Sequence, residues 1–526
     1  MGRYDIGHDP SIWWVLPTPR LVGVATLVKS SLGKNRTDIV KQLTLVLYFI
    51  CLALLSIYGA HIYWLVYWER RDAKRKQQKP RDDRTAWPMV TIQLPLYNEP
   101  AVAARLIDAV VAFDYPKDRL EFQVLDDSDD ETPDVIRERV AVHRRNGIDI
   151  VHIRRSVRTG YKAGALAHGL TQARGEFIAV FDADNVPQPS FIKELIDEFD
   201  DPNVGMAQAR WDHLNVNRTL LSRAQAMYLD GHFFIEQKGR NAAGVFLNFN
   251  GTAGIWRKTA IESSGGWLAD TLTEDLDLSY RAQMRGWRLV YRPDVAVPSE
   301  LPNDVRAFKL QQYRWARGTV QTARKTLPLL WRGSFPIKTK LAATLHLTTK
   351  FIAILMVAMT VLLVPALWYR WDSWVLKFAV VDCPLFVLAT GSMSIFYHRV
   401  QKVTGRSEQG LWWRMPLLMS VGIGLTITNS GAVLDGLFGG AGTFQRTPKL
   451  GVVGEKIARL GSSLPFQPSA LLELLSGLYA LCAIAVALIE GVWVAVPFLI
   501  TFMVGYLYLG WQGLIASWRS GSKLAD

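Results

Sequence analysis

The chain has 526 residues and a formal net charge of +13; 49% of its residues are hydrophobic and 19 are tryptophan. This length exceeds that of one ordinary soluble domain, and the apolar content indicates a membrane protein with a water-facing part. The basic residues gather beside apolar stretches, as in "ERRDAKRKQQKPRDDR" at 69–84, which is typical of cytoplasmic membrane flanks. This placement argues against nucleic acid as a partner. The three cysteines lie in apolar stretches without the spacing of a metal site.

Apolar stretches of membrane-spanning length occur near the N-terminus and in the last third of the chain. A span needs about 20 residues, and the candidates are 43–68, 345–368, 375–397, 470–489 and 492–511. No removable signal peptide is expected before them. We therefore predict an interfacial segment at 1–40, a span at 41–68, a water-facing domain at 69–340, two spans at 341–400, an interfacial helix and a loop at 401–460, and two spans with a tail at 461–526.

One apolar segment, "MPLLMSVGIGLTIT" at 415–428, is short for a span and has basic residues on both sides. If both flanks are cytoplasmic, the segment lies at the interface or re-enters the bilayer. Five crossings then place the N-terminus outside, with the large domain and the C-terminus inside. A sixth crossing through this segment is the alternative.

The polar block alternates short β-branched runs with amphipathic stretches. The runs are "MVTIQLPLY", "LEFQVLDDS", "IDIVHIRR" and "GEFIAVFDAD", and amphipathic helices are expected at 101–113 and 132–146. This alternation predicts an α/β fold with a doubly wound parallel sheet. Ligands bind at the carboxyl ends of the strands in such sheets. The motifs "YNE" (97–99), "DDSDDE" (126–131) and "DAD" (182–184) fall there, so we expect them to form one site.

Asp182 and Asp184 close an apolar run in "VFDADNVP" at 180–187. One interpretation is a turn, because Asp and Asn bond nearby backbone and Pro187 stops the strand. The other is a site for a nucleotide diphosphate, whose phosphates approach carboxylates through a divalent cation. Mg²⁺ and Mn²⁺ favour carboxylate, water and phosphate oxygens. The neighbouring motifs favour the second interpretation, with one carboxylate on the metal and one near the sugar or ribose.

A second group of acids lies in "TLTEDLDLSYRAQMRGW" at 271–287. It is typical of a helix start, with a threonine cap and acids near the positive end of the helix dipole. Crowded carboxylates also raise the proton affinity of one of them, which suits a general base. We predict Asp275 as that base, with Glu274 and Thr273 orienting it.

"QQYRWARG" at 311–318 ends an amphipathic basic stretch. Trp and Arg are common at membrane interfaces, so simple anchoring is one interpretation. In the other, Arg314 clamps a leaving diphosphate through paired hydrogen bonds and Trp315 supports the apolar face of a sugar.

In chain order, "DDS", "DAD", "TED" and "QQYRW" resemble the D, DxD, TED and QxxRW series of processive family 2 glycosyltransferases. The chain is similar to cellulose synthase and, more closely, to the cellulose synthase-like A group of mannan and glucomannan synthases and their bacterial relatives. "TIQLPLYNE", "FQVLDDSDDET", "RTGYKAGAL" and "NFNGTAGIWRKTAIESSGGW" carry the closer match, which runs from about residue 89 to 449. "TFQRTPK" at 443–449 resembles the FxVTxK gating loop of cellulose synthases, with Arg446 replacing the usual valine.

The resemblance implies a cytosolic glycosyltransferase-A-type domain and Mg²⁺ or Mn²⁺ as cofactor. For the donor, the resemblance implies base and ribose binding by Tyr97, Glu99, Asp126 and Asp127, phosphate contact by Lys162, and nucleotide and metal binding by Asp182 and Asp184, with Asp184 as metal ligand. For the acceptor, it implies a site at Asn250, Gly251 and Thr252. Pyrophosphate and terminal-sugar binding fall to Gln311, Arg314 and Trp315, and closure over the donor to Thr447 and Lys449.

The predicted function is that of an inverting, processive hexosyltransferase. It would polymerise a β-linked polysaccharide (β-1,4-glucan, mannan or glucomannan) from UDP-glucose or GDP-mannose and pass it through its own membrane helices. The protein would be a multi-pass integral membrane protein, in the inner membrane if it is bacterial; accessory subunits are left open. The nearest alternative is a non-processive family 2 enzyme that adds one sugar to a lipid. A non-catalytic scaffold and a transporter are the others, and the latter is disfavoured because no span shows paired intramembrane charges.

Overall fold

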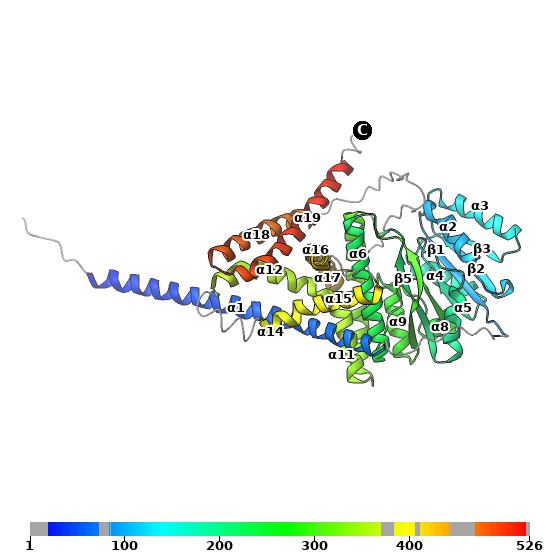
Figure 1. Cartoon of the computed structure of the whole chain (residues 1–526), viewed down its shortest axis with the longest axis horizontal. Helices are drawn as coiled ribbons and strands as arrows, with labels where there is room; N and C mark the ends of the chain where they lie inside the picture. The colour runs from blue at the N-terminus through cyan, green and yellow to red at the C-terminus, as the bar shows by residue number, and fades with distance from the viewer. Residues whose placement is uncertain are drawn as a thin grey trace, which may run out of the picture.

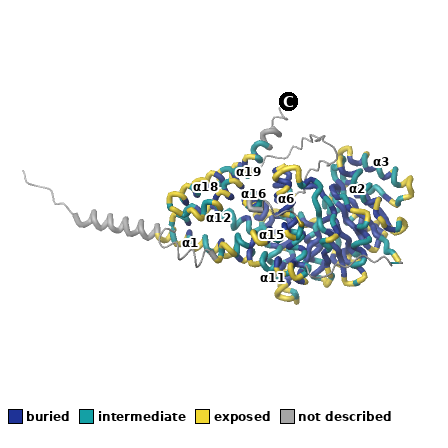
Figure 2. The backbone as a smooth tube through the Cα atoms, viewed as in Figure 1, coloured by how far each residue is buried: buried dark blue, intermediate teal, exposed yellow. Residues whose placement is uncertain are grey.

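The computed structural model describes residues 19–72, 84, 86–302, 304–369, 383–405, 411–440, 442 and 469–521. An α/β domain lies beside a bundle of apolar helices, and the long helix α1 (Pro19–Asp72) runs along the bundle to the domain (Figure 1). Burial is densest in the domain (Figure 2). The bundle helix α18 (Ser469–Ile489) instead exposes Leu471, Leu475 and Leu478 by half or more. Apolar side chains exposed along a helix are suited to contact with lipid.

A seven-stranded sheet forms the centre of the domain, in the order β3-β2-β1-β4-β6-β5-β7. The strands are β1 (Val90–Leu96), β2 (Leu120–Asp126), β3 (Ile150–Arg154), β4 (Phe177–Val180), β5 (Val204–His213), β6 (Gly254–Arg257) and β7 (Arg288–Ser299). The predicted strands and the α/β class are confirmed. The expectation of a parallel sheet is wrong at one strand, because β6 pairs antiparallel with both β4 and β5. The sheet is therefore mixed.

Helices cover both faces of this sheet. One buried cluster joins strand side chains to α2 (Pro100–Val111), α3 (Thr132–Arg145) and α5 (Phe191–Ile196). A second joins them to α4 (Tyr161–Gln172), α8 (Lys258–Ser263) and α9 (Glu274–Met284). The apolar spacing explains this packing: α2 starts with Pro100 at its first turn and buries Val102, Leu106 and Val110 on one stripe. The strand ends are thereby held in fixed positions.

Further helices connect the domain to the bundle. They are α6 (Leu220–Asp230), a π-helical segment (Gly231–Gln237), α7 (Lys238–Ala243), α10 (Val305–Arg332), α11 (Ile337–Thr348), α12 (Ile352–Tyr369), α14 (Cys383–Phe386), a second π-helical segment (Val387–Gly391), α15 (Ser392–Thr404), α16 (Leu411–Gly424), α17 (Thr426–Phe438) and α19 (Val496–Gly521). Asp304 caps α10, because its carboxylate accepts a hydrogen bond from Ala307 N. A buried cluster of α6, α10, α15, α16 and α19 side chains joins the domain to the bundle.

Four helical stretches among the described residues are long and apolar enough to cross a membrane: Asp38–Asp72, Ile337–Tyr369, Ser469–Ile489 and Trp493–Ile515. They correspond to four of the five predicted spans. The remaining one, 375–397, lies partly outside the described residues. Its described part continues as the helix α15, which buries Phe396, Tyr397 and Val400, and it is not among the four. The chain here mixes apolar and polar side chains and packs against the domain.

The local structure also differs from the predicted N-terminal boundary and from the predicted short segment 415–428. The boundary predicted at residue 40 falls inside a helix, because α1 begins at Pro19 and runs unbroken into the first candidate span. The segment 415–428 belongs to a longer helical pair, Arg414–Gly424 and Thr426–Phe438, bent by 41°. A fifth span through this pair and a re-entrant path both agree with that geometry.

One candidate span, α18, carries a charge that is paired with a helix outside the candidate spans. Glu473 of this helix is fully buried and forms an ion pair with Lys309 of α10. The two residues lie 164 positions apart, so the pattern within a single span does not reveal the pair.

Candidate active site

A cavity lies at the carboxyl ends of β1, β2 and β4, between the sheet and the helices α9 and α10. The predicted residues that line it are Tyr97, Glu99, Asp127, Lys162, Asp182, Asp184, Asn250, Gly251, Thr252, Thr273, Glu274, Asp275, Gln311, Arg314 and Trp315. Asp126 is absent from the cavity wall, and Thr447 and Lys449 lie outside the described residues. The tertiary structure thus brings together motifs that are spread over more than 200 residues of sequence.

The turn after β4 places two carboxylates at the cavity. Asp182 N donates hydrogen bonds to Asn185 Oδ1 (2.9 Å) and Thr252 Oγ1 (2.8 Å). Asp184 Oδ2 accepts a hydrogen bond from Glu300 N at 3.0 Å. The expected turn chemistry is therefore present, and it holds both side chains at the wall. Asp182 is more exposed than Asp184, which is 5% exposed.

Lys162 connects this turn to the segment 250–252, which directly precedes β6. Its Nζ lies 2.5 Å from Asp182 Oδ1 and donates to Gly251 O at 2.8 Å. Burial works to lower the pKa of Lys162, but the carboxylates of Asp182 and Glu274 outweigh it and raise the pKa. The ammonium group therefore stays charged at neutral pH beside the acid turn.

The end of β2 separates the two predicted acids. Asp127 lines the cavity and pairs with Arg155, whose Nε lies 2.9 Å from Asp127 Oδ1. Asp126 is 1% exposed, and its carboxylate contacts His152 Nε2 at 2.8 Å and Ser128 N at 2.9 Å. Burial works to raise the pKa of Asp126, but these hydrogen bonds hold it below its ordinary value. Successive side chains on a strand point to opposite faces, so this end presents Asp127 to the cavity while Asp126 braces the loop.

An arginine that the sequence reasoning missed lies beside Tyr97. The guanidinium carbon of Arg158 is 3.3 Å from the centre of the Tyr97 ring and 4.9 Å from that of Tyr161. Both Tyr97 and Arg158 line the cavity. A cation over an aromatic face is a favourable contact, and it gives this end of the cavity a flat, positively charged surface.

The segment 250–252 packs directly against Asp275. Gly251 has a φ of +80°, and a Cβ atom at this position would lie 2.9 Å from Asp275 Oδ2. Glycine is therefore required both by backbone conformation and by space. The side chain of Asn250 is held by His232 Nε2 and Gln237 Nε2, at 2.9 and 2.8 Å. Thr252 is buried and supports the Asp182 turn with its hydroxyl.

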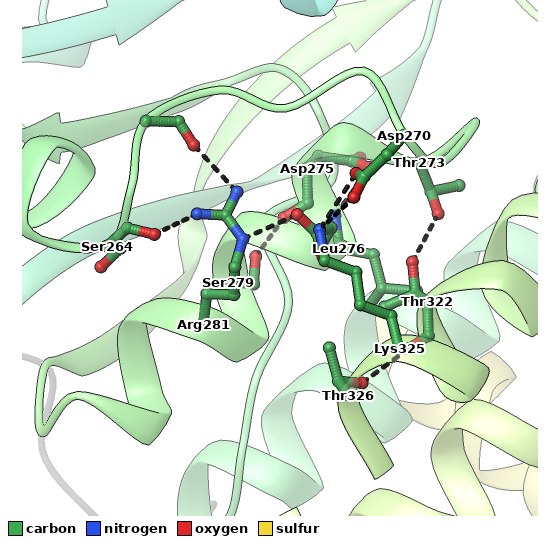
Figure 3. A network of polar contacts seen from close by, with 12 residues as sticks. Ser264, Asp270, Thr273, Asp275, Leu276, Ser279, Arg281, Thr322, Lys325 and Thr326 are labelled. Carbon is green, nitrogen blue, oxygen red and sulfur yellow. Dashed lines mark hydrogen bonds and ion pairs between the residues drawn. The ribbon is translucent and has the colours of Figure 1, made fainter. Parts of the chain in front are cut away.

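Asp275 lies in the first turn of α9, which begins at Glu274 as the sequence predicts (Figure 3). Its Oδ1 accepts a hydrogen bond from Leu276 N at 2.8 Å. Burial raises the pKa of Asp275 to about 7, assisted by the negative charge of Glu274 and opposed by Lys162. A carboxyl group with this pKa can accept a proton near neutral pH.

Thr273 occupies the cap position of α9 but does not cap it. Its Oγ1 contacts Thr322 Oγ1 of α10 at 3.2 Å (Figure 3). Leu272 N donates to Gln321 Oε1 at 3.0 Å. A Cβ at Gly318 would lie 2.6 Å from Thr273 Cγ2, so α10 approaches this segment closely. Thr273 therefore connects α9 to α10, and Glu274 acts on Asp275 through its charge.

Helix α10 forms the opposite wall of the cavity. Gln311, Arg314 and Trp315 follow an i, i+3, i+4 spacing and all line it. Burial lowers the pKa of Arg314, and the nearby carboxylates, Glu274 first, oppose the shift. The rings of Trp315 and Trp211 lie 6.4 Å apart, centre to centre, at 55°. This side of the cavity thus combines the half-buried cation Arg314 and the ring of Trp315 with the ring of Trp211 from β5.

Several cavity residues come from strand ends that the sequence reasoning did not use. Trp211 and His213 end β5, and Glu300 directly follows β7. The rule that placed the other motifs, ligand binding at strand ends, would also have placed "WDH" at 211–213 and "SEL" at 299–301.

The donors at this cavity suit a cation that is shared with a phosphate ligand. Within the described ranges, three or more His, Cys, Asp or Glu side chains do not converge into a metal-ligand cluster. Glu300, the acid beside Asp184, forms an ion pair with Arg105 at 2.8 Å. Asp182 and Asp184 remain as hard oxygen donors. Mg²⁺ is commonly held by one or two carboxylates together with phosphate oxygens and water, so these residues fit such a cation and do not form a cage of protein ligands alone.

Comparison with known proteins gives concordant results. The family model described as "Glycosyltransferase like family 2" matches residues 88–318. Glucomannan 4-beta-mannosyltransferase 2 of Arabidopsis thaliana is 41% identical over 272 residues, which are 49% of this chain and 50% of that protein. Glucomannan 4-beta-mannosyltransferase 1 of Oryza sativa subsp. japonica is 42% identical over 260 residues, or 47% and 49% of the two chains. The chain thus spans about half the length of the curated relatives it matches.

A solved structure shares the fold. It is the mannosyltransferase PcManGT from Pyrobaculum calidifontis in complex with GDP-Man and Mn²⁺, which is 21% identical, has a TM-score of 0.52, and covers 74% of this chain and 99% of its own. The predicted resemblance and the glycosyltransferase-A-type fold are confirmed. Residues 88–318 of the chain, with the cavity at their strand ends, match the family 2 glycosyltransferase model.

Proposed function

We propose that the chain is a membrane-embedded, processive, inverting hexosyltransferase that polymerises a β-linked polysaccharide from a nucleotide sugar. One observation carries the proposal: a single cavity joins the acid turn at Asp182 and Asp184, the carboxyl group of Asp275, and the half-buried cation Arg314. Glycosyl transfer needs these three elements to hold a diphosphate, accept a proton and stabilise a leaving group.

The nucleotide end of the donor belongs at the β1 and β2 side of the cavity. Tyr97 and Arg158 supply a flat surface there, and Asp127 and Glu99 supply oxygen acceptors for base and ribose. Asp126 does not reach the cavity, so its role in this proposal is to support the loop through His152 and Ser128. Lys162, beside Asp182, faces the phosphates.

Asp184, with Asp182, would hold Mg²⁺ or Mn²⁺ together with the donor diphosphate. When bound, the cation offsets the charge of the phosphates and of the departing diphosphate. Arg314 provides a second positive group near Asp182. Its planar guanidinium can donate paired hydrogen bonds to a phosphate, and Gln311 lies one helical turn earlier on the same wall.

The reaction follows from the position of Asp275. The acceptor hydroxyl gives its proton to the Asp275 carboxylate, and its oxygen forms a bond to the anomeric carbon of the donor sugar. The bond from that carbon to the diphosphate oxygen breaks, and the nucleoside diphosphate leaves with the electron pair. Attack from the side opposite the leaving group inverts the configuration, so an α-linked donor yields a β-linked product.

The aromatic pair at α10 supports a polymeric acceptor. Trp315 of α10 and Trp211 of β5 both line the cavity, where an aromatic ring can support the apolar face of a terminal sugar. Asn250 and Gly251 lie beside Asp275 and would orient the attacking hydroxyl. Thr447 and Lys449, outside the described residues, keep their predicted role of closing over the donor.

The sugar is proposed to be mannose, donated by GDP-mannose and joined in β-1,4 linkage. The support is the identity to proteins named glucomannan 4-beta-mannosyltransferases, which covers about half of their length. UDP-glucose is the competing donor. The test is the purified full chain in nanodiscs, incubated with Mn²⁺ and with GDP-mannose, GDP-glucose or UDP-glucose in turn.

Nucleotide release and product length are measured, and linkage-specific glycosidases then digest the product. Long product from GDP-mannose that a β-1,4-mannanase degrades supports the proposal. Release of nucleotide with transfer of a single sugar to lipid identifies the non-processive alternative. An absence of nucleotide release from every donor overturns the enzyme assignment.

The membrane arrangement is proposed to place the domain and both flanks of the bent pair α16–α17 on the cytoplasmic side. The basic flanks of this pair support it. The test uses a variant in which the three native cysteines are replaced and a cysteine is introduced at Ser407 or at Gly451, both outside the described residues. Both introduced cysteines should resist an impermeant thiol reagent in intact cells. Labelling at one position alone means that the pair crosses the bilayer.

A further inference from the structure

A buried ion pair connects the α10 wall of the cavity to the helix bundle. Lys309 of α10 and Glu473 of α18 are each fully buried, with Lys309 Nζ 2.5 Å from Glu473 Oε2. Lys309 Nζ also donates to Leu509 O of α19 at 3.3 Å. Thr428 Oγ1 of α17 donates to Glu473 Oε1 at 3.1 Å. Four helices therefore meet at one pair of charges.

The ion pair lies on the side of α10 that faces away from the cavity. Gln311, Arg314 and Trp315 occupy one face by their i, i+3, i+4 spacing. With 3.6 residues per turn, Lys309 falls on the opposite face, where the buried Gln312 and Ala316 follow it. One helix thus carries the cavity wall on its front and this attachment on its back.

A second set of contacts follows the same helix towards its C-terminus. Tyr313 Oη donates a hydrogen bond to Asp435 of α17, and Arg324 Nη1 donates to Gly436 O at 3.0 Å. A Cβ at Gly436 would lie 2.8 Å from Val320 Cβ. Helix α17 therefore packs closely along α10, and any shift of the bundle at this place moves the cavity wall.

Stability alone does not explain a buried ion pair. The cost of removing two charges from water is of the same order as their attraction, and apolar residues of similar volume often serve equally well. A charged pair with directional hydrogen bonds does differ from an apolar contact in one respect: it fixes how far the helix is rotated and advanced along its axis.

We propose that the Lys309–Glu473 pair is a positioning device that sets the register of α10 against α17, α18 and α19 and thereby places Trp315 against the terminal sugar of the growing polymer. The inference rests on the proposed polymerase function. It predicts that the pair governs retention of the polymer more strongly than donor binding, because Arg314 and Gln311 are the donor contacts on α10 and the others lie on the sheet side of the cavity.

The test uses the full chain in nanodiscs and the double variant Lys309→Met/Glu473→Leu, which removes both charges and keeps side-chain volume. The expected result is a melting temperature at or above that of the parent, because no unpaired charge remains. Polymer formed per nucleotide released should fall by about threefold or more, because a misplaced Trp315 no longer aligns the acceptor. The KM for donor should change by a smaller factor than this ratio, because most of the donor contacts lie on the sheet side of the cavity.

Single variants show whether a general loss of stability also lowers the amount of polymer formed per nucleotide released. Glu473→Gln leaves Lys309 buried without a counter-ion, so its stability should fall. The matched control is Glu69→Gln. Glu69 is a fully buried carboxylate of α1 that pairs with Arg399 of α15 and Lys238 of α7, away from α10. Stability should fall in this control too, while the ratio of polymer to released nucleotide stays that of the parent.

The outcomes separate this inference from the proposed function. If the parent releases no nucleotide, the proposed function fails. If the parent polymerises and the double variant keeps both its stability and its ratio, the positioning role is overturned. Should the double variant not fold, Thr428→Val decides: it removes one hydrogen bond to Glu473, and a ratio equal to that of the parent overturns the inference.

Discussion

The two walls of the cavity use charge differently. On the sheet side, the acids are compensated: Asp127 pairs with Arg155, Asp182 with Lys162 and Glu300 with Arg105. On the helix side, Asp275 forms no ion pair among the described residues, and burial with Glu274 raises its pKa to about 7. Compensated charges at strand ends can hold a ligand in one place, whereas an uncompensated carboxyl group can take up a proton. The comparison agrees with the proposed roles, in which the sheet side supplies most of the donor contacts and Asp275 on the helix side accepts the proton.

The largest expected effect comes from removing the metal-side carboxylate of the sheet wall. Asp184→Ala should abolish detectable donor binding, because the diphosphate loses the cation that links it to the protein. The measurement is titration of GDP-mannose, or of UDP-glucose if that is the donor, at saturating Mn²⁺. Excess EDTA should have the same effect on the parent protein.

A parent protein that binds donor and stays active in excess EDTA would contradict the metal assignment. Glu131→Gln, which changes an exposed acid beyond the cavity, is the control and should bind donor like the parent.

On the helix wall, Asp275→Asn should reduce turnover by about a hundredfold or more, because the group that accepts the hydroxyl proton is lost. Donor affinity should change by about twofold at most, since the sheet side is intact. Single-turnover transfer and donor titration are the two measurements.

The matched control for this variant is Asp270→Asn. Asp270 pairs with Lys325 at 2.7 Å outside the cavity (Figure 3), so its loss should leave turnover within about twofold of the parent. Near-normal polymer synthesis by Asp275→Asn would refute Asp275 as the base.

The pH dependence of kcat/KM tests the role of Asp275 as the base. Because the pKa of Asp275 is about 7, kcat/KM should fall by about tenfold per pH unit below that value as the base becomes protonated. It should level off above pH 7. A flat profile between pH 5.5 and 8 would exclude a base with this pKa.

The same pKa predicts a stability effect with a definite sign. The folded state binds the Asp275 proton more tightly than the unfolded state, so this group favours folding at low pH and loses that contribution as the pH rises through about 7. Asp275→Asn should therefore raise the melting temperature at pH 8 more than at pH 5. An equal shift at both pH values would argue against an uncompensated charge.

The smallest effect is expected from the aromatic part of the helix wall. Trp315→Ala should lower polymer formed per nucleotide released by a few-fold, since stacking of a sugar is worth roughly 1 kcal/mol, while slow hydrolysis of the donor continues. Trp331→Ala is the control, because Trp331 lies on the same helix and bonds Thr344 away from the cavity. An unchanged ratio for Trp315→Ala at equal amounts of folded protein would leave Trp315 as a membrane anchor.

Much of the sheet side could be predicted because its signals are local. Strand periodicity and the acids directly after "FIAVF" and "FQVL" place Asp127, Asp182 and Asp184 at one edge of a sheet. The exceptions have physical reasons. Neighbouring Asp126 and Asp127 look equivalent in sequence, yet strand geometry turns one towards His152 and the other towards the cavity. The four-residue β6 gives no local indication of its antiparallel direction.

The sequence by itself determined the kinds of groups present: the acid motifs at strand ends, the helix start at Glu274, the aromatic and basic residues of α10, and helices apolar enough to span a membrane. Tertiary structure alone decided how those groups behave. The raised pKa of Asp275 depends on burial and on its place relative to Glu274 and Lys162, and the pairing of Lys309 with Glu473 joins helices 164 residues apart. Desolvation and long-range contacts depend on which surfaces meet in the folded chain, and a short stretch of sequence does not show which surfaces these are.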